Sequence, residues 1–299
     1  MLIAACAPGQ VASVPPRFDT GVDPESWARV PTGEFAMGQH DDLVRVDAFE
    51  IMVTDVTNAQ YARYLNKALA DGKVKIASGK VVGYYPGDQF HARRHEKKIE
   101  PGDWLHVPIG DGDLRLVYDG KTFAVKPGYE NHPMVAVTWF GAKAYCEYYG
   151  WRLPTEAEWE KAARGGLVGK KYPWGDNITH NEANYYGTGG NDDKWSGTSP
   201  VGSFAPNGYG LYDMAGNVWE WCADEYDSGY YSKSLKNNPK GPGIAITLGN
   251  NNFTNVYTMR VIRGGAWRYS PSYLRCACRL GYVPTLTYYY LGFRCSQDQ

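Results

Sequence analysis

The sequence of 299 residues lacks several features that would define its function class. Its 31 Lys and Arg nearly balance its 32 Asp and Glu, with a net charge of −1, so no basic field attracts phosphate backbones and we expect no nucleic-acid partner. No apolar run approaches the length of a membrane span, so we expect no membrane-spanning helix. Six cysteines without a paired CxxC pattern are too few for a disulfide scaffold, and we expect most to be buried small hydrophobes.

The composition is that of a folded, loop-rich protein. Hydrophobic residues make up 43% of the chain and charged residues 21%, which is enough apolar surface for a packed core and argues against disorder. The 35 glycines and 18 prolines predict many turns, and the 24 tyrosines and 10 tryptophans are unusually many. The length allows one large domain or two ordinary ones.

The first 29 residues are rich in proline and aperiodic, which predicts an irregular N-terminal lead-in. They begin with MLIAAC, which resembles the end of a bacterial lipoprotein signal and would make Cys6 the lipid-bearing residue at a cell surface. The charged and long apolar parts of such a signal are missing. The alternative is an ordinary N-terminus on a cytoplasmic protein.

Periodicity and end signals predict the regular elements. Alternation of apolar and polar residues around glycines predicts short strands over 30–55. Helical patterns with N-cap threonines occupy 57–72, 138–150 and 155–165, and the first and third carry a capping box. We expect an α+β fold with two main helices, short strands and much irregular structure.

Two stretches fall outside this pattern. Residues 73–130 read as strand pairs joined by glycine turns, which predicts a β-rich insertion, and their basic run HARRHEKK is interpreted as a solvated loop. Residues 166–262 are mostly Gly, Asn, Asp, Pro and aromatic. So long an irregular stretch in a compact domain needs an organiser, such as a metal ion.

Several ordered motifs resemble the formylglycine-generating-enzyme (sulfatase-modifying factor) family. The resemblance covers roughly residues 30–70 and 131–295 and rests on PTGEFAMG, VTNAQYARYL, HPMVAVTWFGAKAYCEYYGWRLPTEAEWEKAARGG, YPWGD, SPVGSFAPNGYGLYDMAGNVWEW, RGGAW and LGFR. It implies a variant of the C-type lectin fold, an α+β domain with few regular elements. We therefore expect one domain over 30–299, with the insertion at about 73–130.

The resemblance does not carry the activity with it. Oxidase members of the family hold copper through a cysteine pair shortly after the RGG motif, where this chain has Tyr269 and, near Tyr273–Leu274, no cysteine. Hydroxyl groups do not replace thiolates for Cu(I), so we expect neither copper nor this oxidation. Other relatives use iron held by histidines; His91 and His95 are four residues apart, but lie in the insertion.

The segment 268–290, between RGGAW and LGFR, resembles the variable region of target proteins of diversity-generating retroelements, which use the same fold. These systems mutate template adenines, often in AAC or AAT codons, whose third base stays a pyrimidine. Such codons cannot become Glu, Lys, Gln, Met or Trp, and none of these five occurs in 268–290. We interpret 268–290 as a variable region.

The chemistry of this segment also favours binding. Tyrosine offers a large contact area with two side-chain torsions, and Ser and Gly add adaptability, as in antibody paratopes. Three consecutive tyrosines cannot all face one core, because alternate residues of a strand face opposite ways. The alternative is a Tyr-rich edge strand covered by the insertion. The predicted binding surface comprises Tyr269, Ser270, Ser272, Tyr273, Cys276, Cys278, Leu280, Tyr282, Thr285, Thr287, Tyr288, Tyr289 and Tyr290.

Two calcium sites follow from the resemblance. The first consists of the Asp213 and Glu220 carboxylates with the carbonyls of Gly216 and Val218, whose alternating oxygens suit a hard cation. The alternative is that both acids hydrogen-bond loop amides. The second site maps onto Asn184, Tyr185, Asp193 and Trp195. Either ion would be structural, with no open position for chemistry.

Three functions compete. We favour a non-catalytic protein, and thus not an enzyme, that binds a protein or cell-surface ligand through a diversified face and is a monomer. The first alternative is a formylglycine-generating or related oxidase with an altered active site. The second is a sugar-binding lectin, but the EPN and QPD motifs typical of calcium-dependent lectins are absent.

Overall fold

The computed structural model describes residues 19–187, 194–249 and 257–299. Cys6, most of the predicted lead-in and Asp193 lie outside these ranges. Within them, no helix is long and apolar enough to cross a membrane.

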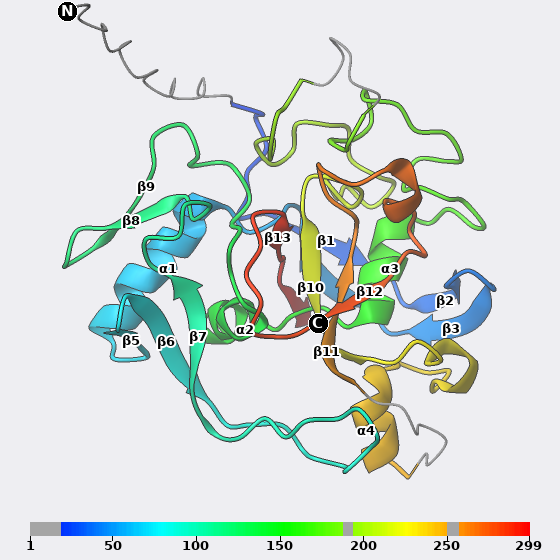
Figure 1. Cartoon of the computed structure of the whole chain (residues 1–299). Coiled ribbons are helices and arrows are strands. Elements are labelled where there is room, and N and C mark those ends of the chain that lie inside the picture. Colours follow the sequence, from blue (N-terminus) through cyan, green and yellow to red (C-terminus); the bar gives the residue numbers. More distant parts are fainter. Residues whose placement is uncertain (1–18, 188–193, 250–256) are drawn as a thin grey trace, which may run out of the picture.

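A four-stranded sheet forms the centre of the molecule (Figure 1), in the order β12-β11-β10-β13. Strand β10 (Trp219–Tyr226) pairs antiparallel with β11 (Tyr257–Arg263), which pairs antiparallel with β12 (Leu280–Tyr282). The short β13 (Leu291–Gly292) runs parallel to β10 on its other edge. The 268–290 segment therefore lies between two strands that flank β10.

Both faces of the central sheet are buried. Trp219 and Trp221 of β10 belong to one core cluster and Cys222 to a second; in β11, Ile262 and Val261 divide in the same way. Because alternate side chains of a strand point to opposite faces, the sheet separates two cores. The β10 sequence accordingly places apolar side chains on both faces, and its acids Glu220 and Asp224 are buried as well.

A second sheet joins the two ends of the described chain. Its order is β1-β4-β14, from β1 (Trp27–Val30), β4 (Phe49–Met52) and β14 (Ser296–Asp298). The hairpin β2 (Gly33–Met37) and β3 (Asp42–Val46) lies between β1 and β4 in sequence. The strands expected over 30–55 are thus confirmed, but the irregular lead-in ends before residue 29, because β1 begins at Trp27.

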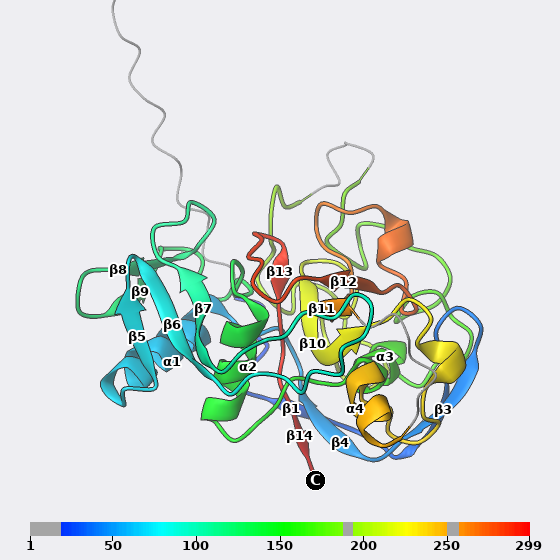
Figure 2. The same ribbon diagram turned by 60° about the horizontal axis from the view of Figure 1, so that its bottom comes forward.

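Three of the four α-helices in the described ranges were predicted from their caps. They are α1 (Asn58–Ala70), α2 (Trp139–Tyr148) and α3 (Glu156–Arg164), and both capping boxes are formed. The fourth, α4 (Gly241–Thr247), was not predicted, and the helix content exceeds the two main helices expected. Figure 2 shows α1 on one side of the central sheet and α3 and α4 on the other.

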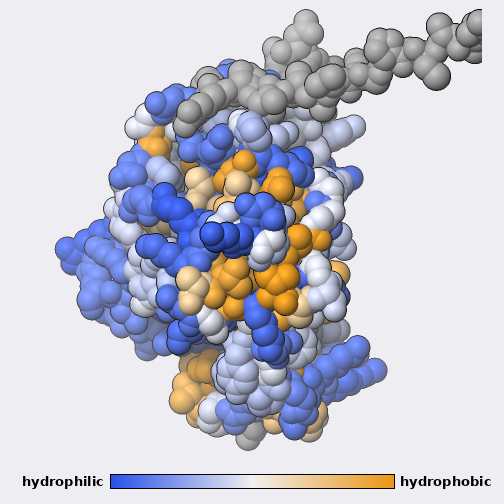
Figure 3. Space-filling model, turned by 90° about the vertical axis from the view of Figure 1, so that its left-hand side faces the viewer, coloured by the Kyte–Doolittle hydropathy of each residue, from blue (hydrophilic) through white to orange (hydrophobic). Residues whose placement is uncertain are grey.

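The insertion is β-rich, as predicted. Strands β5 (Val74–Ala77), β6 (Lys80–Tyr85) and β7 (Gly102–Pro108) form one sheet, and β8 (Leu116–Tyr118) pairs with β9 (Phe123–Val125). The β6 and β7 strands pack against α2, and β9 packs against α1. Figure 3 shows apolar side chains gathered on this side of the molecule, within polar surroundings.

A disulfide between Cys146 of α2 and Cys295 corrects the expectation for the cysteines. The two Cα atoms are 5.7 Å apart, and 149 residues separate them in sequence. The free Cys222, Cys276 and Cys278 are buried, as expected of small hydrophobes. The disulfide ties the chain just after LGFR to the helix that carries the insertion sheet.

Candidate functional site

Two glycines shape the start of the 268–290 segment. Both Gly264 and Gly265 have positive φ angles, 95° and 75°. A Cβ atom at Gly265 would lie 2.7 Å from the Leu274 side chain, so a larger residue would collide with the segment that folds back over it. The RGG motif therefore serves as a tight turn out of β11.

Arg263 fixes the middle of the segment from below. Its fully buried guanidinium donates hydrogen bonds of 2.6 Å to the carbonyls of Cys276 and Cys278 and forms an ion pair with Glu160. The two side chains are enclosed as well, because Cys276 packs into one core cluster and Cys278 into the other. The exposed fractions are 1% for Cys276 and 8% for Cys278.

Arg279 provides a second anchor. Its Nε and Nη2 donate to the two carboxylate oxygens of Glu156 at 2.6 and 2.8 Å, and its Nη1 donates to the carbonyl of Asp227. The guanidinium also lies 4.6 Å from the ring centre of Tyr226. These contacts, with those of Arg263, hold the backbone of residues 276–279 as part of the frame.

The prediction of surface positions is therefore wrong for three residues. Cys276 and Cys278 are buried in the two core clusters, and Tyr290 is 7% exposed. Tyr290 is enclosed because the neighbouring rings of Tyr288, Tyr289 and Tyr269 pack around it. The other ten are partly or fully exposed, and we call them the tyrosine face: Tyr269, Ser270, Ser272, Tyr273, Leu280, Tyr282, Thr285, Thr287, Tyr288 and Tyr289.

The six tyrosines of the segment form one connected cluster around Tyr290. Its ring stacks on Tyr288 at 4.9 Å and meets the edges of Tyr289 and Tyr269 at 5.1 and 5.4 Å. Tyr273 contacts Tyr269 at 5.3 Å, and Tyr282 contacts Tyr288 at 5.5 Å. Such edge and stacked pairs add to the stability of the cluster beyond simple burial.

The phenol groups of this cluster are neutral hydrogen-bonding groups. The hydroxyls of Tyr269 and Tyr282 lie 3.2 Å apart. Burial raises the pKa of Tyr282 to about 12, because the charged phenolate is poorly solvated there. At neutral pH the Tyr282 phenol therefore offers an uncharged hydroxyl to a partner.

The charge around the tyrosine face is positive. The segment 268–290 contains no Asp or Glu. The exposed Arg268 places its guanidinium 5.1 Å from the ring centre of Tyr289 and 5.4 Å from that of Tyr290. Arg275 donates from Nε to the Ser272 carbonyl. Arginine stacked on tyrosine is typical of energetically important positions in protein interfaces.

A hollow next to the tyrosine face was missed in the sequence. It encloses about 480 Å³ and is lined by residues 178–181, 185–187 and Pro271. Tyr186 is 66% exposed there, and its backbone N–H donates to the Tyr269 carbonyl. The NYYG motif was the available signal, because it places an exposed tyrosine outside the 268–290 segment.

In the first predicted calcium site, the carboxylates of Asp213 and Glu220 already accept hydrogen bonds from protein groups. Glu220 accepts from Nε and Nη2 of Arg294 at 2.7 and 2.9 Å and from the Trp159 indole, and Asp213 accepts from the Gly202 N–H at 2.7 Å. Gly216 and Val218 lie in the turn between them. An ion held by both carboxylates does not fit unless Glu220 releases its partners.

One observation nevertheless favours a cation nearby. Asp55 is fully buried, neither of its carboxylate oxygens has a hydrogen-bond partner, and the closest approach to Arg294 is 3.8 Å. Burial raises the pKa of Asp213 to about 6. No group of three or more His, Cys, Asp or Glu side chains in the described part of the chain is arranged as a metal site. Calcium at Asp213 stays a prediction.

The second predicted calcium site is incomplete in the described structure, because Asp193 lies outside it. The side-chain amide of the buried Asn184 donates to the Gly197 carbonyl at 2.8 Å. The backbone carbonyl of Asn184 accepts from the backbone N–H of Asn217. Tyr185 stacks on His180 with ring centres 4.2 Å apart. Trp195 lies near His132, with ring centres 6.2 Å apart. These contacts neither require nor replace an ion.

The positions that carry copper-binding cysteines in oxidase relatives are not thiols here. Tyr269 is half-buried within the tyrosine cluster, and Leu274 is fully buried. The free thiols nearby are poor substitutes: burial raises the pKa of Cys276 to about 12, and it also raises that of Cys278. Thiolate is the form that binds soft metals.

The two histidines of the basic run have other partners. His91 contacts Glu96 and Thr247, each at 3.2 Å, and its side chain is 9% exposed. His95 stacks on Tyr257 at 4.6 Å. The run HARRHEKK is thus not merely a solvated loop, because His91 docks it onto α4.

Sequence comparisons give a consistent result. The model of the sulfatase-modifying factor enzyme 1-like domain matches residues 13–299. The formylglycine-generating enzyme of Streptomyces coelicolor is 33% identical over 331 residues, covering 99% of this chain and 94% of the relative. Serine/threonine-protein kinase pkn1 of Chlamydia pneumoniae is 36% identical over 276 residues; the match covers 89% of this chain but 37% of the kinase.

Solved structures share the fold. PvdO from Pseudomonas aeruginosa superposes with a TM-score of 0.60 at 25% identity, covering 91% of this chain and 94% of that one. Treponema denticola variable protein 1 also gives a TM-score of 0.60, at 21% identity, covering 91% and 95%. At that identity the second likeness shows the fold alone. The expected α+β fold is confirmed.

Proposed function

Because this chain belongs to the sulfatase-modifying factor enzyme 1-like domain family, we propose that it is a member that binds a macromolecular ligand through the tyrosine face instead of performing oxidation. The observation that carries this proposal is the connected cluster of six tyrosines, five of them accessible at the surface. An accessible aromatic cluster of this kind marks an interaction site.

The frame beneath the face supports diversification. Arg263 of β11 donates to the backbone carbonyls of Cys276 and Cys278 in the segment. Arg279 of the segment binds the carboxylate of Glu156 in the core. Substitutions at the ten face positions leave these contacts in place. The segment therefore keeps its path while its exposed side chains change, as a diversity-generating retroelement target requires.

The ligand we propose is a protein surface with exposed acidic groups. Arg268 and Arg275 are the charged side chains of the segment that reach the face, and no acid accompanies them. Guanidinium groups beside phenol rings suit carboxylates and backbone carbonyls of a partner. A monomer with this single face stays our prediction for the free protein.

A genomic observation tests the diversification directly. We expect a near-copy of the coding sequence of 268–290 beside a reverse-transcriptase gene, and sibling proteins that differ from this one mainly at adenine-derived codons of the ten face positions. Differences scattered evenly along the chain would remove the proposal. Differences confined to buried positions of the segment, such as Cys276, would also contradict it.

A tolerance experiment tests the frame. A variant with Ser270, Tyr273, Thr285, Thr287 and Tyr289 replaced together by other residues that AAC-derived codons encode is expected to keep its melting temperature within a few degrees. The matched control replaces the buried Leu274, Cys276 and Tyr290, and is expected to melt far lower. Equal losses in both variants would show that the face is part of the core.

The oxidase alternative is tested with copper. If it holds, the purified protein binds Cu(I) tightly and consumes oxygen in the presence of a cysteine-containing peptide. Our proposal expects neither. The relevant positions carry Tyr269 and, near Tyr273–Leu274, no cysteine, and hydroxyl and alkyl groups are not Cu(I) ligands.

We also propose that the protein works in an oxidising compartment, because disulfides such as Cys146–Cys295 persist there. This agrees with a place at the cell surface. Alkylation of freshly lysed cells with a thiol reagent should leave Cys146 and Cys295 unmodified even after denaturation. Their modification would indicate a reducing compartment. The lipid-bearing role of Cys6 stays a prediction.

A further inference from the structure

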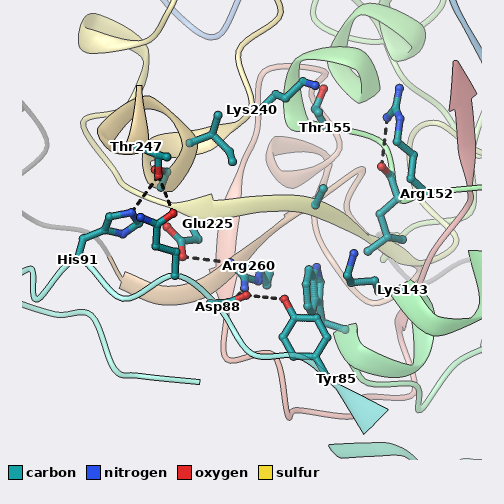
Figure 4. A pocket seen from close by; sticks show the side chains of 16 residues that line it. Tyr85, Asp88, His91, Lys143, Arg152, Thr155, Glu225, Lys240, Thr247 and Arg260 are labelled. Atoms are coloured by element: carbon teal, nitrogen blue, oxygen red, sulfur yellow. Dashed lines mark hydrogen bonds and ion pairs between the residues drawn. The ribbon is translucent and has the colours of Figure 1, made fainter. Parts of the chain in front are cut away.

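A second pocket lies where the insertion meets the body of the fold. It encloses about 340 Å³ and shares no residue with the tyrosine face. Its walls come from the end of β6 and the loop after it, α2, β10, β11 and α4 (Figure 4). A volume of this size falls within the range of small-molecule sites, which favour junctions between structural units.

One end of the pocket is closed by the insertion. The Nε2 of His91 lies 3.2 Å from the Thr247 hydroxyl, and that hydroxyl lies 3.2 Å from Oε1 of Gln89. Thr247 is the last residue of α4. The loop of the insertion is therefore attached to α4 by side-chain hydrogen bonds, and the pocket exists only because the two meet.

The two acids of the pocket, Asp88 and Glu225, share one cation. Arg260 is 4% exposed, and it forms ion pairs with Asp88 and, at 3.5 Å, with Glu225. Its guanidinium also lies 4.3 Å from the ring centre of Trp139. Oε2 of Glu225 is buried and has no hydrogen-bond partner, so the single cation Arg260 balances only one of the two negative charges behind the pocket wall.

The accessible charges of the pocket are positive. Arg152 and Lys143 each pair with acids outside the pocket, Arg152 with Glu158 and Lys143 with Glu147. Lys240, exposed on the loop before α4, forms no ion pair with any residue in the described ranges. Figure 4 shows Lys143 and Arg152 on one side of the pocket and Lys240 above it.

Between these cations the walls are largely apolar. Ala223 and Tyr85 are half-buried. Ile244, an apolar residue of α4, is 46% exposed. Leu153 and Trp139 lie behind them. The lining also contains Asp88 and Glu225, but its most exposed charge is Lys240, which has no ion pair within the described ranges. An apolar surface beside such a cation suits a ligand with an apolar body and an anionic end.

We propose that this pocket binds a small organic anion, an aromatic or aliphatic carboxylate, with its apolar body between Ile244 and Ala223 and its carboxylate toward Lys240 and Lys143. The site is independent of the tyrosine face and does not rest on the function proposed for that face. It is formed in part by the insertion, which lies outside the motifs shared with the family.

The test uses two probes of the same shape and opposite charge, 1-naphthoate and 1-naphthylmethylammonium, with the full chain. We expect 1-naphthoate to bind in the sub-millimolar range in calorimetry and to shift the NMR signals of the Ile244 and Leu153 methyl groups by its ring current. We expect the ammonium probe to bind at least several-fold more weakly. Equal binding of the two probes, or no binding of either up to its solubility limit, overturns the proposal.

Two matched variants locate the charge effect. Lys240→Glu is expected to weaken 1-naphthoate by about fivefold to tenfold, the effect of reversing a partly exposed charge beside the ligand. Lys67→Glu, on the exposed side of α1 outside the pocket, serves as control and is expected to leave the affinity unchanged. An equal loss in both variants, or none in Lys240→Glu, overturns the assignment of the carboxylate end.

Discussion

The guanidinium of Arg294 and the carboxylate of Glu220 form a two-point pair in the fully buried interior, with Nε–Oε2 and Nη2–Oε1 distances of 2.7 and 2.9 Å. Arg294 also donates to the carbonyls of Val53 and Tyr212. One residue thus joins β10, the chain after β4 and the loop before the Asp213 turn. It belongs to the LGFR motif, which explains why that motif marks the end of the segment.

Replacement of Arg294 by methionine is expected to lower the free energy of unfolding by about 3–5 kcal/mol, because Glu220 would keep a buried charge without a partner. Urea unfolding at neutral pH measures the loss. The control is Arg63→Met, which breaks an ion pair with Glu25. The side chains of Arg63 and Glu25 are 59% and 48% exposed, so this change should lower the free energy of unfolding by about 1 kcal/mol or less. Similar losses in the two variants would contradict the role of Arg294.

Truncation of two tyrosines should separate the face from the core. Tyr273 is 39% exposed and Tyr290 is 7% exposed, although both belong to one ring cluster. Tyr290→Ala is expected to cost about 3 kcal/mol or more of unfolding free energy, as for other buried aromatic residues, and Tyr273→Ala about 1 kcal/mol or less. Chemical denaturation of both variants measures this. A larger loss for Tyr273 would mean that its ring, not Tyr290, is the structural centre.

Loss of the Cys146–Cys295 disulfide should destabilise the fold, because the bond restrains the unfolded chain over 149 residues. The double variant Cys146→Ser/Cys295→Ser is expected to lose about 2–5 kcal/mol of unfolding free energy. Thermal denaturation with and without dithiothreitol measures it. The reductant should lower the melting temperature of the wild type and leave that of the double variant unchanged; a drop in both would point to another cause.

Asp213 should make the stability depend on pH. Burial raises its pKa to about 6, whereas an unfolded aspartate titrates near about 4. Because the folded state holds its proton more tightly, its stabilising effect is present below about pH 4 and is lost as the pH rises through about 6. Asp213→Asn should therefore gain up to about 2–3 kcal/mol over the wild type at neutral pH, and little at pH 4. Urea unfolding across this range in EGTA measures the difference.

Calcium extends this experiment. An ion bound by the Asp213 carboxylate stabilises the folded wild type by mass action, so calcium should raise its melting temperature and reduce the advantage of Asp213→Asn. The asparagine keeps an oxygen for the Gly202 N–H, so the variant still folds. No calcium effect on the wild type would contradict the predicted first site.

Local signals predicted most of the regular structure. Thr57 with Gln60 and Thr155 with Glu158 form the expected capping boxes, and the glycine turns of the insertion join real strand pairs. Helix α4 escaped prediction because its sequence GPGIAIT contains two glycines and a proline. Its apolar residues are explained by tertiary contacts, with β10 and with a small cluster around Tyr230. Tertiary packing, not propensity, decides such short helices.

The face was predicted from composition, and its errors have one physical cause. Cys276 and Cys278 look like surface positions in a Tyr- and Ser-rich segment, but Arg263 binds their carbonyls from below. The Cys146–Cys295 bond was missed for the same reason, since contacts between residues far apart in sequence leave no local pattern. The pocket around Arg260 likewise requires the insertion and α4 to meet, which no motif announces.

The 268–290 segment leaves the sheet beside one edge of β10 and returns beside the other, so its two ends are held at a fixed separation by a single strand. A synthetic library could therefore vary the ten positions of the tyrosine face between fixed attachment points. It would have to keep the buried Leu274, Cys276, Cys278 and Tyr290 and the anchor Arg279.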